Sequence, residues 1–177
     1  MARSSKSQQQ DRPAPRLRRA YYDCRYGQLH LHNAIPAGGG FDELTPAICL
    51  HGAGETGRVF MPLLAALGEA RSAYAPDLPG AGESDPAPGE TGIESAVHAI
   101  VDFVDSMRIR VFDLLARGTA AHAALKLLEL RGPAVRRVLI LGADGMRSGP
   151  KVTVLSAADV ADPRLPARVV ELLRAGP

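Results

Sequence analysis

Three segments combine glycines with residues that could do chemistry, and each follows a short apolar run. They are residues 51–57, 77–85 and 116–120. The last segment reads A-R-G-T-A and fills the positions of the G-x-S-x-G pattern, in which a tight turn between a strand and a helix presents a serine nucleophile. The small residues that let strand and helix approach are kept. The nucleophile position is Gly118, which has no side chain, so the pattern predicts a fold more firmly than an activity.

The apolar pattern predicts the elements that position these segments. A β-hairpin is indicated by residues 20–26 and 28–32 around Gly27, and a loop by residues 33–43. A continuous apolar run typical of a buried strand covers residues 47–50, and further strands are indicated over residues 73–75, 111–115 and 135–141. Helical spacing of apolar residues covers residues 59–67, 93–104 and 121–128. The alternation predicts an α/β protein with a doubly wound, mostly parallel sheet, helices on both faces, and an antiparallel hairpin before it.

Length and composition fit one folded domain. The chain has 177 residues, of which 46% are hydrophobic and 23% charged, as in an ordinary globular protein. The net charge of +2 is uneven, because residues 1–20 carry six basic residues and one acidic residue, which leaves 15 basic against 18 acidic residues beyond them. We therefore predict a disordered basic tail over residues 1–19 and a single, mildly acidic domain over residues 20–177.

Partners and location follow from the same composition. The tail has no aromatic residue to stack on bases, and no apolar run in the chain approaches a membrane span, so we expect neither nucleic acid nor membrane as a partner. The tail lacks the apolar core of a secretory signal, although its arginine-rich composition also fits a transit peptide. Cys24 and Cys49 offer no disulfide framework. We expect a cytoplasmic protein.

Four motifs stand in the order found in one enzyme family. The stretches LHGAGETG, APDLPGAGESD, DLLARGTAAHAAL and VRRVLILGADG resemble the amino-terminal half of an α/β hydrolase, over about residues 21–145. The resemblance implies an oxyanion hole formed by the backbone N–H group after His51 and Gly52 and by the one after the nucleophile position. These donors fall on Ala53 and Thr119. It also implies descent from an ester or carbon–carbon bond hydrolase, without a cofactor or a metal.

The catalytic triad of that family is not complete in this sequence. Gly118 replaces the nucleophile, and the family's catalytic base is a histidine after the last strand, whereas all five histidines here precede residue 123. Residues 151–163 resemble the strand and loop that carry the acid, which falls on Asp159. Because an acid without its histidine orients nothing, we predict a protein without triad catalysis.

The carboxyl-terminal part is shorter than the resemblance implies. Nine residues, 142–150, separate the strand at 135–141 from the one that starts near Lys151, whereas a parallel crossover usually takes a dozen or more. The family's lid and crossover helix are missing, which predicts a truncated α/β-hydrolase fold. Either the last strand pairs through an atypical short connection, or the final segment docks irregularly and only residues 165–173 form a helix.

Backbone donors survive the loss of a nucleophile, so the site is still expected to bind. We predict weak binding of a small acyl or carboxylate ligand among His51, Gly52, Ala53, Thr119 and Arg117, where the arginine adds a planar donor.

Two other functions stay open. The first is an active hydrolase with a non-standard nucleophile or base. The second is a dinucleotide-binding protein, because GAGETG satisfies G-x-G-x-x-G and Asp77 ends the next predicted strand. Against the second, Glu55 would place a carboxylate beside the pyrophosphate.

Overall fold

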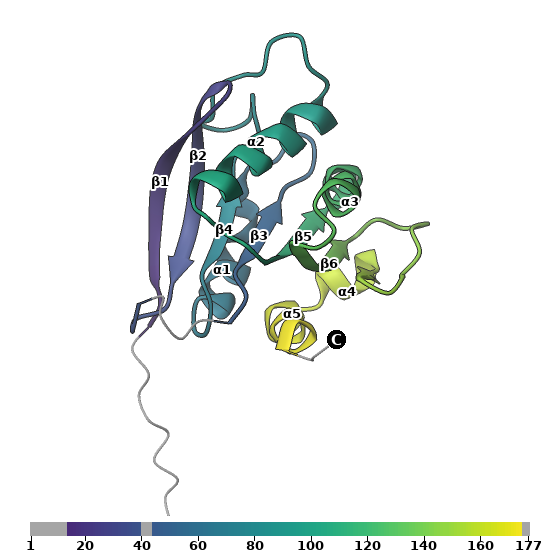
Figure 1. Ribbon diagram of the computed structural model, residues 1–177. Coiled ribbons are helices and arrows are strands. Elements are labelled where there is room, and N and C mark those ends of the chain that lie inside the picture. The colour runs from purple at the N-terminus through teal and green to yellow at the C-terminus, as the bar shows by residue number, and fades with distance from the viewer. Residues whose placement is uncertain (1–13, 40–43, 175–177) are drawn as a thin grey trace, which may run out of the picture.

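The computed structural model describes residues 14–39 and 44–174. In this part of the chain a single seven-stranded sheet runs in the order β1-β2-β4-β3-β5-β6-β7 (Figure 1). The strands are β1 Arg16–Cys24, β2 Gly27–Ile35, β3 Ala47–Leu50, β4 Ala73–Pro76, β5 Phe112–Arg117, β6 Val135–Leu141 and β7 Val152–Leu155. β2 is antiparallel to both β1 and β4, and all neighbours from β4 to β7 are parallel. The predicted hairpin and mostly parallel sheet are confirmed.

Helices cover both faces of this sheet. They are α1 Met61–Leu67, α2 Gly92–Ser106, α3 Ala121–Leu130, α4 Ala157–Ala161 and α5 Leu165–Arg174, with short 3-10 turns η1 Gly57–Phe60 and η2 Gly118–Ala120 before α1 and α3. α2 and α3 pack on one face, whereas α1 and α5 pack together on the other. None of the described helices has the length and apolarity that crossing a membrane requires.

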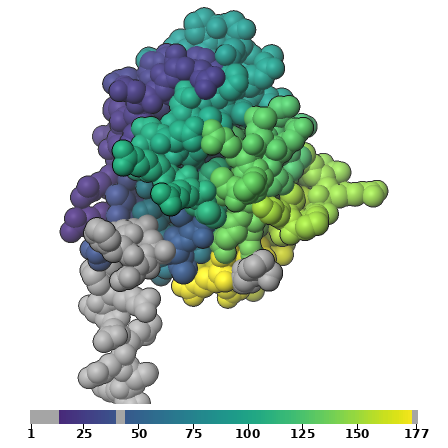
Figure 2. Space-filling view, viewed as in Figure 1, coloured from purple at the N-terminus to yellow at the C-terminus, as the bar shows by residue number. Residues whose placement is uncertain are grey.

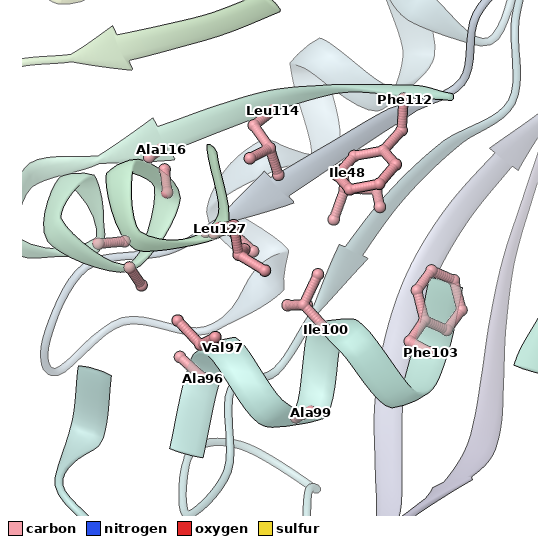
Figure 3. Packing of buried hydrophobic residues seen from close by; sticks show 14 of the residues in the cluster. Ile48, Ala96, Val97, Ala99, Ile100, Phe103, Phe112, Leu114, Ala116 and Leu127 are labelled. Carbon is pink, nitrogen blue, oxygen red and sulfur yellow. The ribbon is translucent and has the colours of Figure 1, made fainter. Parts of the chain in front are cut away.

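The core divides at the sheet because the side chains of a strand alternate between its faces. On β5, Phe112 and Leu114 point toward α2, from which Ile100 points back toward the sheet in Figure 3. Leu115 faces the other way, into the cluster made with α1 and α5. β5 is accordingly apolar toward both faces, with Asp113 as its one fully buried charged residue.

The hairpin is longer than predicted. Its register runs from Arg16 opposite Ile35 to Cys24 opposite Gly27, so residues 16–19, predicted as tail, and residues 33–35, predicted as loop, lie in strands. The reason is that β1 is an edge strand with an exposed, arginine-rich start, which resembles a solvated tail in composition. Residues 1–13 of the predicted tail lie outside the described residues.

The connection between β6 and β7 takes the first of the two predicted routes. β7 pairs in parallel with β6, from Val138 opposite Val152 to Leu141 opposite Leu155. Residues 142–151 contain no helix, and this works because about ten extended residues reach roughly 33 Å, more than the length of a four-residue strand. In Figure 2 the yellow-green tip of this connection protrudes from the body.

The same connection folds back along the outer edge of β7. Gly149 exchanges both backbone hydrogen bonds with Val152, at 2.8 and 3.1 Å, and the Val154 N–H group donates to Ser148 Oγ at 3.0 Å. Lys151 Nζ fixes the base of the connection by donating to the carbonyl groups of Gly132 and Val135, both at 2.7 Å. The backbone donors of this sheet edge are therefore used within the chain.

A buried charge network joins the sheet to the last helix. Asp113 on β5 is fully buried and accepts hydrogen bonds from Arg71 Nη1 and Arg136 Nε, both at 2.9 Å. Both arginines also donate to the Leu173 carbonyl group of α5, at 3.3 and 2.7 Å. Burial lowers the pKa of Arg71 below its ordinary value, and the charge of Asp113 opposes that effect. The carboxyl end of α5 is thus fixed by an ion pair beneath it.

Candidate functional site

The three glycine-containing segments meet at one edge of the sheet. They follow β3, β4 and β5, which are parallel neighbours, so their carboxyl ends lie together. The Ala53 N–H group donates to Thr119 Oγ1 at 2.8 Å, and the Leu78 N–H group donates to His51 Nε2 at 2.8 Å. Ligands of open α/β sheets bind at this edge, so it is the candidate site.

The turn after β5 keeps the geometry of a nucleophile position without the nucleophile. Gly118 has φ of +53°, and η2 leads directly into α3. A left-handed residue at this point makes the sharp strand-to-helix turn that exposes a side chain. A Cβ atom built on Gly118 would meet nothing within 4 Å. The turn would therefore have room for a serine side chain, but residue 118 is a glycine and provides no nucleophile.

Two backbone donors at this edge of the sheet, one of them the predicted donor Ala53, are already bonded within the chain. The Ala53 N–H group is taken by the Thr119 hydroxyl group, and the Gly52 N–H group donates to Glu55 Oε2 at 3.0 Å. The other oxygen of Glu55 lies 2.9 Å from Arg117 Nε. A carboxylate of this chain thus occupies Gly52 and Arg117, two of the residues that were predicted to bind a carboxylate ligand. In the sequence, Glu55 of GAGETG is the one acidic residue of this segment and so the signal for this contact.

His51 is a structural residue of this site. Its ring is buried, Nε2 accepts from the Leu78 N–H group, and Nδ1 therefore carries the proton that it donates to the Gly52 carbonyl group at 2.9 Å. An imidazole with both nitrogens bonded to backbone has no free lone pair for a base. His122 is exposed on α3, and its Nδ1 lies 3.4 Å from the Thr119 carbonyl oxygen. Neither ring is set up to activate a nucleophile at residue 118.

Asp159, the predicted acid position, caps a helix. Its Oδ2 atom accepts from the N–H and hydroxyl groups of Ser156, both at 2.9 Å, at the start of α4. Its Oδ1 atom is paired with Arg168. The bond from the Ser156 backbone, followed by the one from Arg168, lowers the pKa of Asp159. Its carboxylate is therefore engaged on α4 rather than on an imidazole.

Two grooves lie on either side of the Ala53–Thr119 hydrogen bond. One has a volume of about 530 Å³ and contacts Glu55, Arg117 and Gly118 on one side and α4 on the other. The second has about 440 Å³ and is bordered mainly by apolar residues of the Leu78 loop, α2 and α3. Gly52, Ala53 and Thr119 line both. These volumes fit a small ligand.

Asp77 holds the loop after β4 in place. It is buried, accepts from the Gly57 N–H group at 2.8 Å and the Glu83 N–H group at 3.1 Å, and pairs with His30 Nδ1 at 2.9 Å. Burial raises the pKa of Asp77, but these hydrogen bonds outweigh burial and lower it overall. With both oxygens engaged, Asp77 is not free to bind the ribose that the dinucleotide alternative requires.

Ser84, in the same loop, is not available as a nucleophile. Its hydroxyl group donates to the Asp77 carbonyl group at 2.6 Å and accepts from the His30 N–H group at 2.9 Å. Its proton and one lone pair are both used in holding the loop against β2.

Among the described residues, one group could hold a metal ion. Ligand atoms of His30, His32 and Asp77 lie within 4.8 Å of one another. The bonds to Asp77 already use its oxygens, and burial, then the charges of His30, Arg19 and Arg58, lower the pKa of His32 despite the opposing charge of Asp77. Positive charge beside the imidazole works against a bound cation.

Solved structures similar to this chain are hydrolases. The naproxen esterase from Bacillus subtilis matches with a TM-score of 0.63 and 22% identity, over 73% of this chain and 44% of its own. An epoxide hydrolase from Vigna radiata matches with a TM-score of 0.64 and 22% identity, over 82% of this chain and 44% of its own. A serine hydrolase from Cycloclasticus zankles matches with a TM-score of 0.65 and 20% identity, over 76% of this chain and 48% of its own. The chain thus spans less than half the length of these enzymes, and at such identities they show the fold alone.

The sequence comparisons assign the family. Comparison with curated proteins gives no match. A family model described as the alpha/beta hydrolase family matches residues 47–177, which is more than half of the chain and includes all three segments of the site. The resemblance stated from the motifs is thereby confirmed, and the chain belongs to the alpha/beta hydrolase family.

Proposed function

We propose that this chain is a hydrolase-family protein that carries out no triad catalysis and binds a small acyl ligand weakly in the grooves beside Ala53 and Thr119. The observation that carries the proposal is the turn at Gly118, which keeps its left-handed conformation but presents no nucleophile. The bonding of His51 supports it, because the imidazole nearest in sequence to the predicted oxyanion donor is used by backbone. Descent from an ester or carbon–carbon bond hydrolase is consistent with the similarity of the fold to that of a carboxylesterase.

The competing proposal is an active hydrolase with a non-standard nucleophile. Its best candidate is the Thr119 hydroxyl group, one residue from the nucleophile position. That oxygen accepts from the Ala53 N–H group, so it lies in the place of an oxyanion rather than of an attacking group. Without a base beside it, an alcohol stays protonated and weakly nucleophilic.

Introducing the missing serine tests the proposal. We expect the parent and Gly118→Ser to hydrolyse p-nitrophenyl acetate at the same low rate and without a burst of acyl-enzyme, because a serine without a general base remains protonated. Gly118→Ala is the matched control, since both variants share the strain of a side chain at positive φ, about 1–2 kcal/mol. A burst of acyl-enzyme in Gly118→Ser that is absent from Gly118→Ala would show that a general base is present and would contradict the proposal.

The charge of Glu55 decides which acyl ligands bind. We expect the parent to bind butyrate with a dissociation constant on the order of 1 mM or weaker, because Glu55 occupies Arg117 and the Gly52 N–H group. Glu55→Gln removes a like charge and frees the arginine, so butyrate should bind about tenfold more tightly. Backbone amide shifts of Ala53 and Thr119 during a titration measure this directly.

The matched control for that change is Glu129→Gln, which removes the same charge from an exposed position on α3 paired with Lys126. Its butyrate affinity should equal the parent's. Equal affinities in Glu55→Gln and the parent, or shifts confined to remote amides, would mean that the inherited oxyanion site is not the binding site.

A further inference from the structure

A third groove that could hold a ligand lies on the hairpin, away from the candidate site at Ala53 and Thr119. It has a volume of about 600 Å³ and is lined by Leu17, Arg18, Arg19, His32, Arg58 and Met61. Arg19 and His32 are direct neighbours across β1 and β2, whereas Arg58 and Met61 come from η1 and the start of α1. None of these residues lines the grooves at Ala53 and Thr119. The groove is therefore a separate feature of the fold.

The arginines of this groove have no carboxylate partner in the described part of the chain. Most other arginines do: ion pairs join Arg25, Arg71, Arg117, Arg131, Arg136, Arg164 and Arg168 to acidic side chains. No such pair involves Arg18, Arg19 or Arg58. Three arginines thus line one hollow with no ion-pair partner among the described residues, which favours an anionic ligand there.

His32 lines this groove, and its pKa depends on the charged groups around it. The groups around it are His30 and Asp77 on the inner side and Arg19 and Arg58 on the groove side. Burial, then the charges of His30, Arg19 and Arg58, lower the pKa of His32 against the opposing charge of Asp77, which favours the neutral ring. A neutral imidazole still offers one N–H donor to an anion, and it gains a proton more readily once an anion lies beside it.

We propose that this groove binds a phosphate group carried on a small, partly apolar ligand. Arg19 and Arg58 hold the phosphate oxygens, because the planar guanidinium fork matches phosphate geometry. Leu17 and Met61 contact the apolar part. The alternative ligand is a divalent cation held by His30, His32 and Asp77. The positive charges of Arg19 and Arg58 disfavour binding of such a cation.

The test titrates the full chain with inorganic phosphate and with hexyl phosphate, and follows His32 by proton NMR over a range of pH. We expect both to raise the pKa of His32, and hexyl phosphate to bind more tightly than inorganic phosphate because it also covers apolar surface. The double variant Arg19→Gln/Arg58→Gln should bind hexyl phosphate at least tenfold more weakly. Both arginines are exposed, so the variant should fold, which its thermal midpoint verifies.

The matched control is Arg110→Gln/Arg147→Gln, which removes two exposed arginines that lie outside this groove. It should bind hexyl phosphate within twofold of the parent. Equal losses in the two double variants would mean a response to net charge alone and would overturn the site. Vesicles containing phosphatidic acid form a further arm: binding to them without binding of soluble hexyl phosphate would overturn a small-molecule site. Tight Zn²⁺ binding that shifts His32, with no response to phosphate, would overturn the anion in favour of a metal.

Discussion

Replacing Asp113 by alanine is expected to lower the free energy of unfolding by about 3–5 kcal/mol, the usual cost of removing one partner from a buried ion pair. The side chain is fully buried, and it is the acceptor for Arg71 and Arg136. Arg71 is itself 2% exposed and would keep a positive charge without a counter-charge. Because domains of this size are stable by only about 5–15 kcal/mol, the loss is a large fraction of the total and should lower the midpoint of unfolding clearly.

Urea denaturation followed by circular dichroism measures this loss. Asp105→Ala is the control, because Asp105 is also paired with an arginine, Arg131, but is 56% exposed, and such pairs contribute less than about 1 kcal/mol. If the two variants lost the same stability, the network around Asp113 would be no stronger than a surface ion pair. The carbonyl group of Leu173 would also lose its ordered donors, so α5 should loosen first, and amide exchange on α5 should rise before that on β5.

Phe103→Ala should cost about 3–5 kcal/mol as well, for a different reason. The ring is fully buried on the inner side of α2, with its centroid 5.2 Å from the rings of both Tyr22 and Tyr74 (Figure 3). Truncation removes its apolar contacts and both edge-to-face contacts, and leaves a cavity between α2 and the hairpin.

Phe103→Leu separates shape from burial. It keeps most of the apolar volume, so about 1–1.5 kcal/mol is expected. Urea denaturation of the parent and the two variants provides the comparison. A Phe103→Ala variant as stable as Phe103→Leu would show that α2 collapses onto β1 and β2 and fills the space, and the contact with the hairpin would then be plastic rather than fixed.

The best-predicted elements were those whose burial is visible in local sequence. Residues 47–50 are a continuous apolar run and residues 135–141 are apolar except for Arg136 and Arg137, and β3 and β6 have those bounds. The hairpin was misjudged at its open end because Arg16, Arg18 and Arg19 lie on an exposed edge strand, where backbone pairing needs no apolar pattern.

The location of the candidate site was predicted correctly, but the hydrogen-bond partners of its polar groups were not. The three segments do converge, because the alternation of strands and helices gives a parallel sheet, in which the carboxyl ends of β3, β4 and β5 lie at one edge. What local sequence does not give is which partner each polar group chooses. Glu55 bonds to Arg117 from a different loop, and His51 accepts from Leu78, 27 residues away. Such contacts depend on the assembled fold, and they make His51 a support of the loop after β4.

The return of residues 148–149 along β7 also determines how this sheet can grow. A strand that joins a sheet edge needs unpaired N–H and C=O groups, and Val152 and Val154 have already given their N–H groups to Gly149 and Ser148. Any strand supplied in trans, from a second copy or from a separate hydrolase fragment, must first peel this segment away. Fragment complementation at β7 should therefore be slow and limited by local opening, and exchange of strands between copies should be suppressed at this edge.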